Sequence, residues 1–71
     1  MNRINPNKLL LSKWTATKPA RNEKHFIVSE VETNEEDVVI FCVLEAVTSK
    51  RSIQIDWHEL EDAGKWLHGW K

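Results

Sequence analysis

The chain has 71 residues, a net charge of −1 and a hydrophobic fraction of 41%, which is typical of one small folded domain. Cys42 is the only cysteine, which excludes an internal disulfide, and with three scattered histidines it does not make up a four-ligand zinc set. The run Leu9–Leu11 is too short for the apolar segment of a signal peptide and far short of the ~20 residues of a membrane span, so we expect a cytoplasmic protein with no membrane contact.

Residues 1–11 are predicted to be an N-terminal arm, with two alternatives for its structure. Asn5 is a capping residue type and Pro6 suits the first position of a helix, so residues 6–11 could form one helical turn. They could equally lead into a strand.

The next residues predict two strands. Residues 12–17 are β-branched and aromatic, with Trp14 and Ala16 on one face, and residues 18–22 predict a turn or loop. Residues 25–32 predict a second strand. It is expected to turn Phe26 and Val28 to one side and Ile27 and Val31 to the other.

A polar segment, residues 33–37, predicts a hairpin tip, because its spacing lacks the glycine and the distant glutamate of a calcium loop. Residues 38–47 are apolar at both alternating sets of positions and predict a central strand covered on both faces. Cys42 within it is interpreted as a small buried hydrophobe. After a turn, residues 52–55 alternate as a fourth strand.

The end of the chain predicts a helix that begins after Asp56. Glu59 follows three residues later, as in a capping box, and the apolar residues from Trp57 to Trp70 fall on one half of a helical wheel. Gly64 leaves two alternatives open: a close-packing position in a longer helix, or a cap that ends the helix before it.

The predicted fold class is therefore α+β: a four-stranded antiparallel meander, which could curl as in SH3-like barrels, and one short C-terminal helix. We expect a single domain over residues 1–71. Its parts are the arm (1–11), the sheet (12–55) and the C-terminal helical segment (56–70).

Charge and tryptophan content identify the candidate binding residues. Residues 1–24 carry six bases and one acid, whereas residues 25–45 carry six acids and no base. Four tryptophans in so short a chain are unusual, and single-strand nucleic-acid binders place stacking rings beside cations. Tryptophans that form the core are the competing interpretation. The aromatic and basic candidates are Lys13, Trp14, Lys50, Arg51, Lys65, Trp66 and Trp70.

No residue pattern indicates catalysis, a metal or a cofactor. The chain contains serine, cysteine, histidine and acidic residues, but none in a recognisable nucleophile setting, and it has no glycine-rich phosphate loop. We therefore expect a non-enzyme.

Short sequence motifs spread along the chain resemble those of one known family. They are residues 8–16 (KLLLSKWTA), His25 with Phe26, residues 44–47 (LEAV), Trp57 to Leu60, Trp66, and Gly69 with Trp70. As a set they resemble the small tryptophan-rich bacterial proteins of unknown function. The resemblance implies a complete bacterial protein and brings no activity, cofactor, partner or site residue. Arginine is common in that family at the position of His58, which weakens any anion-binding role there.

The functional expectation is an accessory binding module that presents Trp66, Trp70 and neighbouring cations to a protein or a single-stranded nucleic acid. One alternative is a structural homodimer built on the apolar strand 38–47. The other is a small enzyme, which would need a pocket joining His25, Cys42 or His58 to a carboxylate.

Overall fold

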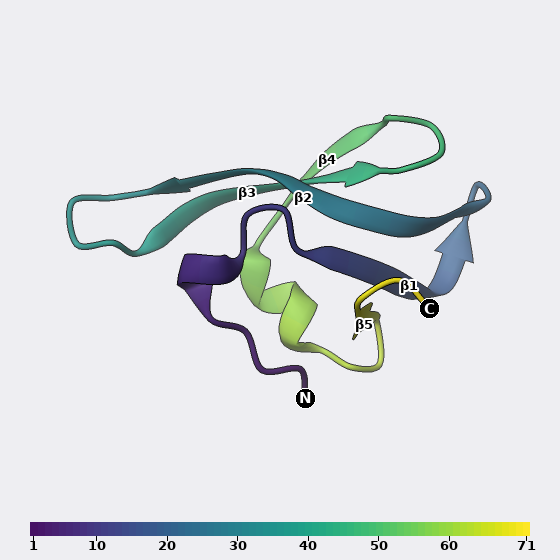
Figure 1. The fold of residues 1–71 in the computed structure, drawn as a ribbon, viewed down its shortest axis with the longest axis horizontal. Coiled ribbons are helices and arrows are strands. Elements are labelled where there is room, and N and C mark those ends of the chain that lie inside the picture. Colours follow the sequence, from purple (N-terminus) through teal and green to yellow (C-terminus); the bar gives the residue numbers. More distant parts are fainter.

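The computed structural model describes residues 1–71 as one five-stranded antiparallel sheet with two short 3-10 helices (Figure 1). The strand order is β4-β3-β2-β1-β5, so the first four strands form a meander and β5 adds to its far edge. The elements are η1 (Pro6–Lys8), β1 (Lys13–Ala20), β2 (Glu23–Thr33), β3 (Val39–Ala46), β4 (Ser52–Ile55), η2 (Trp57–Glu61) and β5 (Trp66–His68).

The prediction of a C-terminal helix over residues 56–70 is wrong, and with it the α+β fold class. Asp56 does cap a helical segment, because its Oδ1 accepts the backbone N–H of His58 at 3.0 Å, but that segment is the five-residue 3-10 helix η2. The chain then turns at Asp62, whose side chain accepts the N–H of Gly64 at 2.8 Å. Trp66 to His68 continue as β5, paired with Trp14 to Ala16 of β1.

The physical reason is that the unpaired edge of β1 competes with the helical pattern for these residues. In an edge strand, the N–H and C=O groups that face outward need partners, and β5 supplies them. As a strand, the same residues turn Trp66 inward onto Phe26, with the ring centroids 5.2 Å apart. Helical spacing and strand alternation both bury Trp66, so the sequence pattern alone does not distinguish them.

The other strands lie close to the predicted ranges, with two differences. Strand β1 continues to Ala20, through residues expected to form a loop, and its pairing with β2 is irregular between Thr15 and Ala20. In β2, a register shift between Val28 and Glu30 turns Val31 to the same side as Val28, opposite the prediction. Val31 lies opposite Cys42 and packs against the core.

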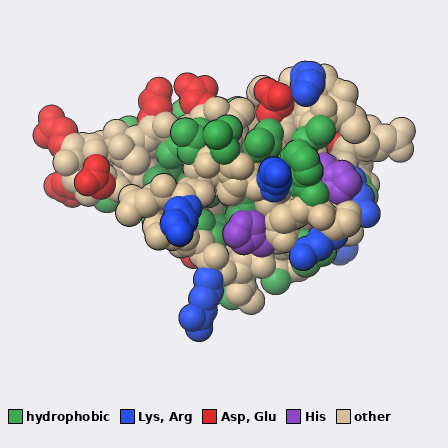
Figure 2. Space-filling model, in the orientation of Figure 1, with side chains coloured by type: hydrophobic (Ala, Val, Ile, Leu, Met, Phe, Trp, Pro, Cys, Tyr) green, Lys and Arg blue, Asp and Glu red, His purple; other side chains and the backbone are tan.

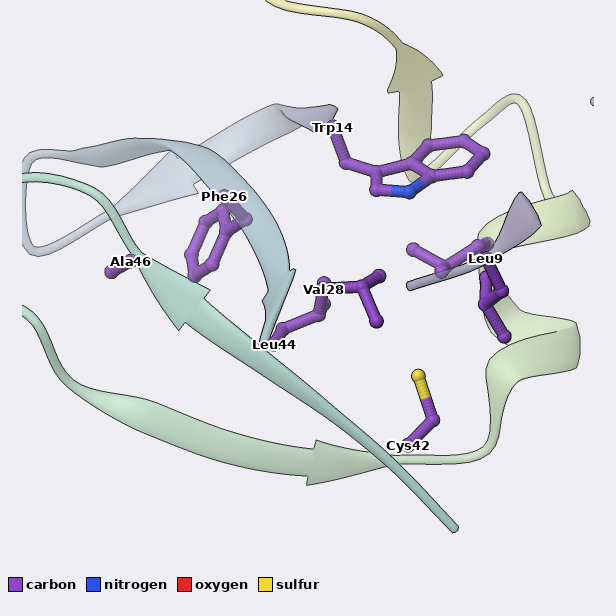
Figure 3. Close-up of a cluster of buried hydrophobic side chains, with 8 residues drawn as sticks. Leu9, Trp14, Phe26, Val28, Cys42, Leu44 and Ala46 are labelled. Atoms are coloured by element: carbon purple, nitrogen blue, oxygen red, sulfur yellow. The ribbon is translucent and has the colours of Figure 1, made fainter. Parts of the chain in front are cut away.

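One face of the sheet carries the hydrophobic core (Figure 3). The buried cluster consists of Leu9, Trp14, Phe26, Val28, Cys42, Leu44, Ala46 and Leu60. Strands β1, β2 and β3 supply most of it, Leu9 follows η1 and Leu60 belongs to η2, so both 3-10 helices cover the same face. The other side chains of β3 are only half-buried or exposed, so the predicted covering of both faces is wrong.

The N-terminal arm forms one helical turn, the first of its two predicted alternatives. Asn5 caps η1 by accepting the N–H of Asn7 at 3.0 Å. Further toward the terminus, the Asn2 side chain donates to the carbonyls of Leu60 and Trp66 at 2.8 and 2.7 Å. The arm is thus attached to both segments that follow β4. Neither helical segment has the length and apolar character needed to cross a bilayer.

Candidate binding site

A hollow of about 430 Å³, here called the Trp66 hollow, opens where β1 departs from regular pairing with β2. Its floor is aromatic, formed by Phe26 and Trp66, and Ala16 lies beside them. The remaining lining residues are Thr17, Lys18, Ala20, Glu23, Arg51, Glu59, Gly64 and Lys65. Because Phe26 is a core residue and Glu59 belongs to η2, the hollow lies on the core side of the sheet.

An ion pair between buried Glu23 and exposed Arg51 forms one wall of the hollow. The Glu23 side chain is only 4% exposed and accepts from Arg51 Nε at 3.1 Å and from Nη2 at 2.5 Å. The Ser49 hydroxyl also donates to this carboxylate. Hydrogen bonds from Arg51 and then Ser49 lower the pKa of Glu23 to about 2, although burial acts in the opposite direction. The same contact raises the pKa of Arg51.

This ion pair positions the Arg51 guanidinium. The Arg51 side chain is 40% exposed, and its Nη1 makes no hydrogen bond within the chain. The planar fork is therefore held by Glu23 on one edge and is open to a ligand on the other.

Lys18 and Lys65 add two further cations to the rim. Both are exposed, and Lys65 is fixed at its backbone, where its carbonyl accepts the N–H of Thr17 at 3.0 Å. The hydroxyl of Thr17 also donates to the Gly64 carbonyl at 2.6 Å. The loop before β5 is thus attached to β1, and Trp66 lies half-buried beneath the two lysines.

The seven predicted binding residues do not form one site. Arg51, Lys65 and Trp66 come together in the hollow. Lys13 and Trp70 form a second group, Lys50 stands at the exposed β3–β4 turn, and Trp14 is completely buried, so it cannot present its ring to a partner. Its indole N–H donates to the Ser12 hydroxyl at 2.8 Å.

The second group lies on the opposite face of the sheet. The Lys13 ammonium is 4.8 Å from the ring centre of Trp70, within range of a cation–π interaction. The Trp70 N–H donates to the Phe26 carbonyl at 3.0 Å, and the ring is 44% exposed. Gly69, with a φ of 87°, turns the chain back over β1 to bring Trp70 there.

A further hollow, of about 590 Å³, lies where β4 leaves the sheet and contains Cys42, Asp56 and His58. His58 Nδ1 is 2.8 Å from Asp56 Oδ1, and the hydrogen bonds from the backbone and ring of His58 lower the pKa of Asp56. Burial raises the pKa of Cys42 to about 11, and its sulfur points into the core cluster (Figure 3). The hollow thus joins a histidine to a carboxylate, and the raised pKa of Cys42 disfavours the thiolate that a cysteine nucleophile needs.

The sequence did not single out the other charged residues of the Trp66 hollow, Lys18, Glu23 and Glu59, or its second aromatic ring, Phe26. Phe26 was expected only as a strand residue, and Glu23 follows a turn with nothing in its neighbourhood to mark it. The excess of bases in residues 1–24 was the one signal that could have pointed to Lys18. Elsewhere, no three histidine, cysteine or acidic side chains come together as metal ligands.

Comparison with known proteins identifies a family but no characterised relative. The family model described as "Tryptophan-rich protein (DUF2389)" matches residues 12–71, and the chain therefore belongs to this family of unknown function. The match confirms the resemblance seen in the sequence. No curated protein and no solved structure matches.

Proposed function

We propose that this member of the tryptophan-rich family is a small binding module, not an enzyme, and that the Trp66 hollow receives an acidic segment of a protein partner. The observation that carries the proposal is the gathering of Lys18, Arg51 and Lys65 around an aromatic floor. Such a floor receives apolar or planar groups, and the cations select a carboxylate beside them.

The Glu23–Arg51 pair supports a carboxylate ligand. Its geometry leaves one edge of the guanidinium open while the arginine side chain is already ordered, so less conformational entropy is lost when a ligand binds. A carboxylate matches the fork of Arg51, and the neighbouring lysines offset the charge of Glu23 and Glu59.

The mixed charge of the hollow favours a protein partner over a nucleic acid. A single-stranded nucleic acid is held by a cationic groove that follows several phosphates, with successive bases on successive rings. This hollow holds two carboxylates among three cations, its rings pack edge to face with each other, and the chain as a whole is slightly acidic. A peptide with one acidic residue next to an apolar one matches this lining better than a single-stranded nucleic acid does.

A phage-displayed library of random peptides tests the proposal. We expect the protein to enrich peptides that carry Asp or Glu beside an apolar residue, and Lys65→Glu to lose that enrichment. Lys8→Glu, at another exposed lysine, on η1, is the matched control and should enrich the same peptides.

Fluorescence anisotropy with the enriched peptide and with a labelled oligothymidine then separates the partner classes. Peptide binding that weakens in Lys65→Glu supports the proposal. Enrichment without acidic residues, or tighter binding of the oligothymidine than of any peptide, would contradict it.

A further inference from the structure

We propose that the outer face of the sheet, the face opposite the core, is a self-complementary interface between two copies of this chain. The inference is independent of the Trp66 hollow, which lies on the core side. It rests on which side chains the register places on this face and on how their charges are distributed.

Two irregularities in the β2–β3 pairing increase the number of side chains on the outer face. In β3, Val39 packs against the core and Cys42 is buried, so Ile40 and Phe41 between them both lie on the outer side. In β2, Val28 and Val31 point inward, which places Ser29 and Glu30 outward in the same way.

The outer face carries a strip of apolar side chains, bordered by Glu45 opposite Ile27 and by Gln54 opposite Val43. Ile27, Phe41 and Val43 are half-buried there, and Ile40 is 62% exposed beside them. Both 3-10 helices pack on the core side of the sheet (Figure 1). At the edge where β4 leaves the sheet, Ile40 and Phe41 border the hollow that η2 also lines. A row of large apolar side chains on an uncovered sheet face is typical of an interaction surface.

The C-terminal residues complete the other end of this face. The Thr15 hydroxyl donates to the Gly69 carbonyl at 2.7 Å and accepts the N–H of Lys71 at 2.9 Å, so residues 69–71 cross the outer side of β1. His25 Nε2 lies 2.9 Å from the Lys71 carbonyl. This segment holds Trp70 over the sheet beside Lys13.

The charges of the outer face are opposite at its two ends. Lys13, Lys71 and one acid, Glu45, lie at the Trp70 end, which therefore keeps a net positive charge. Glu30 and Glu32 lie on the hairpin arm opposite Val43 and Phe41. The hairpin tip continues the acidic end with three further acids (Figure 2), namely Glu35, Glu36 and Asp37.

This distribution is what selects a second copy as the occupant. In a twofold pair, every contact between two different residues occurs twice. If two outer faces stack with their ends reversed, the basic end of each copy meets the acidic end of the other, and the apolar strips of the two copies meet between these ends. Two packed sheets with aligned strands form a sandwich of this kind.

Sedimentation equilibrium of two matched variants tests the interface. Ile40→Asp places a charge on the outer face, and Leu10→Asp places one at a similarly exposed leucine of the N-terminal arm. Because both positions are exposed, both variants should fold. We expect the wild type and Leu10→Asp to dimerise, and Ile40→Asp to remain monomeric at tenfold higher concentration.

A charge exchange tests the relative orientation of the two copies. Lys13→Glu and the double variant Glu30→Lys/Glu32→Lys should each dimerise at least tenfold more weakly than the wild type, because each brings like charges together. Mixed in equal amounts, the two should form a heterodimer, in which every basic end again meets an acidic end.

Two results would overturn the interface proposal. One is a wild-type chain that stays monomeric at about 1 mM. The other is a dimer whose dissociation constant is the same in Ile40→Asp as in Leu10→Asp. Failure of the heterodimer to form from the two charge variants would overturn the reversed stacking.

Discussion

The imidazole of His68 stacks on the indole of Trp14, with the ring centroids 4.5 Å apart and the planes 12° from parallel. The two residues lie directly opposite each other in the β1–β5 pairing. Trp14 is completely buried and β5 has only three residues, so this contact joins the shortest strand of the sheet to the core. Stacked aromatic pairs contribute about 0.5–1.5 kcal/mol beyond their buried area.

We therefore expect His68→Ala to lower the free energy of unfolding by about 1 kcal/mol, because it removes the stacked pair. Urea denaturation followed by tryptophan fluorescence measures the change. His58→Ala is the control, since His58 packs on Trp57 at the surface and lies outside the sheet. Equal losses of unfolding free energy in the two variants would show that the Trp14–His68 stack stabilises the fold no more than the surface contact of His58 does.

The Glu23–Arg51 pair predicts an acid-sensitive contribution to stability. The pKa of Glu23 is about 2 in the folded chain, against an ordinary value of 4.5. A carboxyl group with a lowered folded pKa stabilises the fold above its unfolded pKa, and this contribution is lost as the pH falls through the folded value. It should be complete near neutral pH and disappear between about 4.5 and 2.

The variant Glu23→Gln isolates this contribution, because it keeps the shape of the side chain and removes its charge. Its urea midpoint should lie below that of the wild type at neutral pH, and the two should converge as the pH approaches 2. Lys18→Gln serves as a control for removing a charge from the same hollow. A difference in urea midpoint between Glu23→Gln and the wild type that stays constant with pH would contradict the assignment of this acid-sensitive stability to Glu23.

Cys42 should be unreactive in the native chain. Its side chain is 1% exposed and burial raises the pKa of the thiol to about 11, so little thiolate forms near neutral pH. Labelling with an aromatic disulfide reagent should be slow in buffer and complete within minutes in denaturant. Fast labelling under native conditions would mean that the thiol is accessible and would reopen the enzyme alternative for the neighbouring hollow.

The two glycines should respond differently to alanine. Gly69 has a φ of 87°, so Gly69→Ala is strained even though a Cβ there meets open space, and the strain costs about 1–3 kcal/mol. Gly64 has no such backbone requirement, and a Cβ there would lie 3.1 Å from Asp62 Oδ1, at the end of an exposed side chain.

Thermal unfolding of the two glycine variants measures this difference, and iodide quenching of tryptophan emission reports the position of Trp70. Gly69→Ala should melt lower and quench more strongly than Gly64→Ala, because the Gly69 turn is what holds Trp70 over β1. A larger loss of stability in Gly64→Ala would contradict the backbone argument.

The sequence was sufficient to locate the first four strands and the Asp56 cap, because those signals are local. Alternating Ile53 and Ile55 defined β4 correctly, and the position of Asp56 before an apolar segment defined the start of η2. The prediction of a C-terminal helix was wrong because Trp66 is buried in either conformation, helix or strand. What decided between them was the open edge of β1, 50 residues earlier in the chain.

The site was harder to predict than the fold because its residues meet only through the tertiary structure. Lys65 and Trp66 are neighbours in sequence. Arg51 lies in the same hollow, where its side chain is bound to Glu23, a residue 28 positions before Arg51 in the chain. Lys13 is adjacent to Trp14 in the sequence, but the aromatic ring that its ammonium contacts is that of Trp70. Adjacent residues of a strand point to opposite faces, so a basic residue next to an aromatic one is a poor guide to contact.

The Asn2 side chain has a consequence for the order in which the chain folds. Its bond to the Trp66 carbonyl closes a loop between residues 64 positions apart, and β5 pairs with β1 residues that lie 50 to 54 positions before it. Such closures cost entropy before any burial offsets it, so they should form late. On a ribosome, the β1–β4 meander can therefore assemble early, while Leu9 and Trp14 stay partly uncovered until residues 57–68 have emerged.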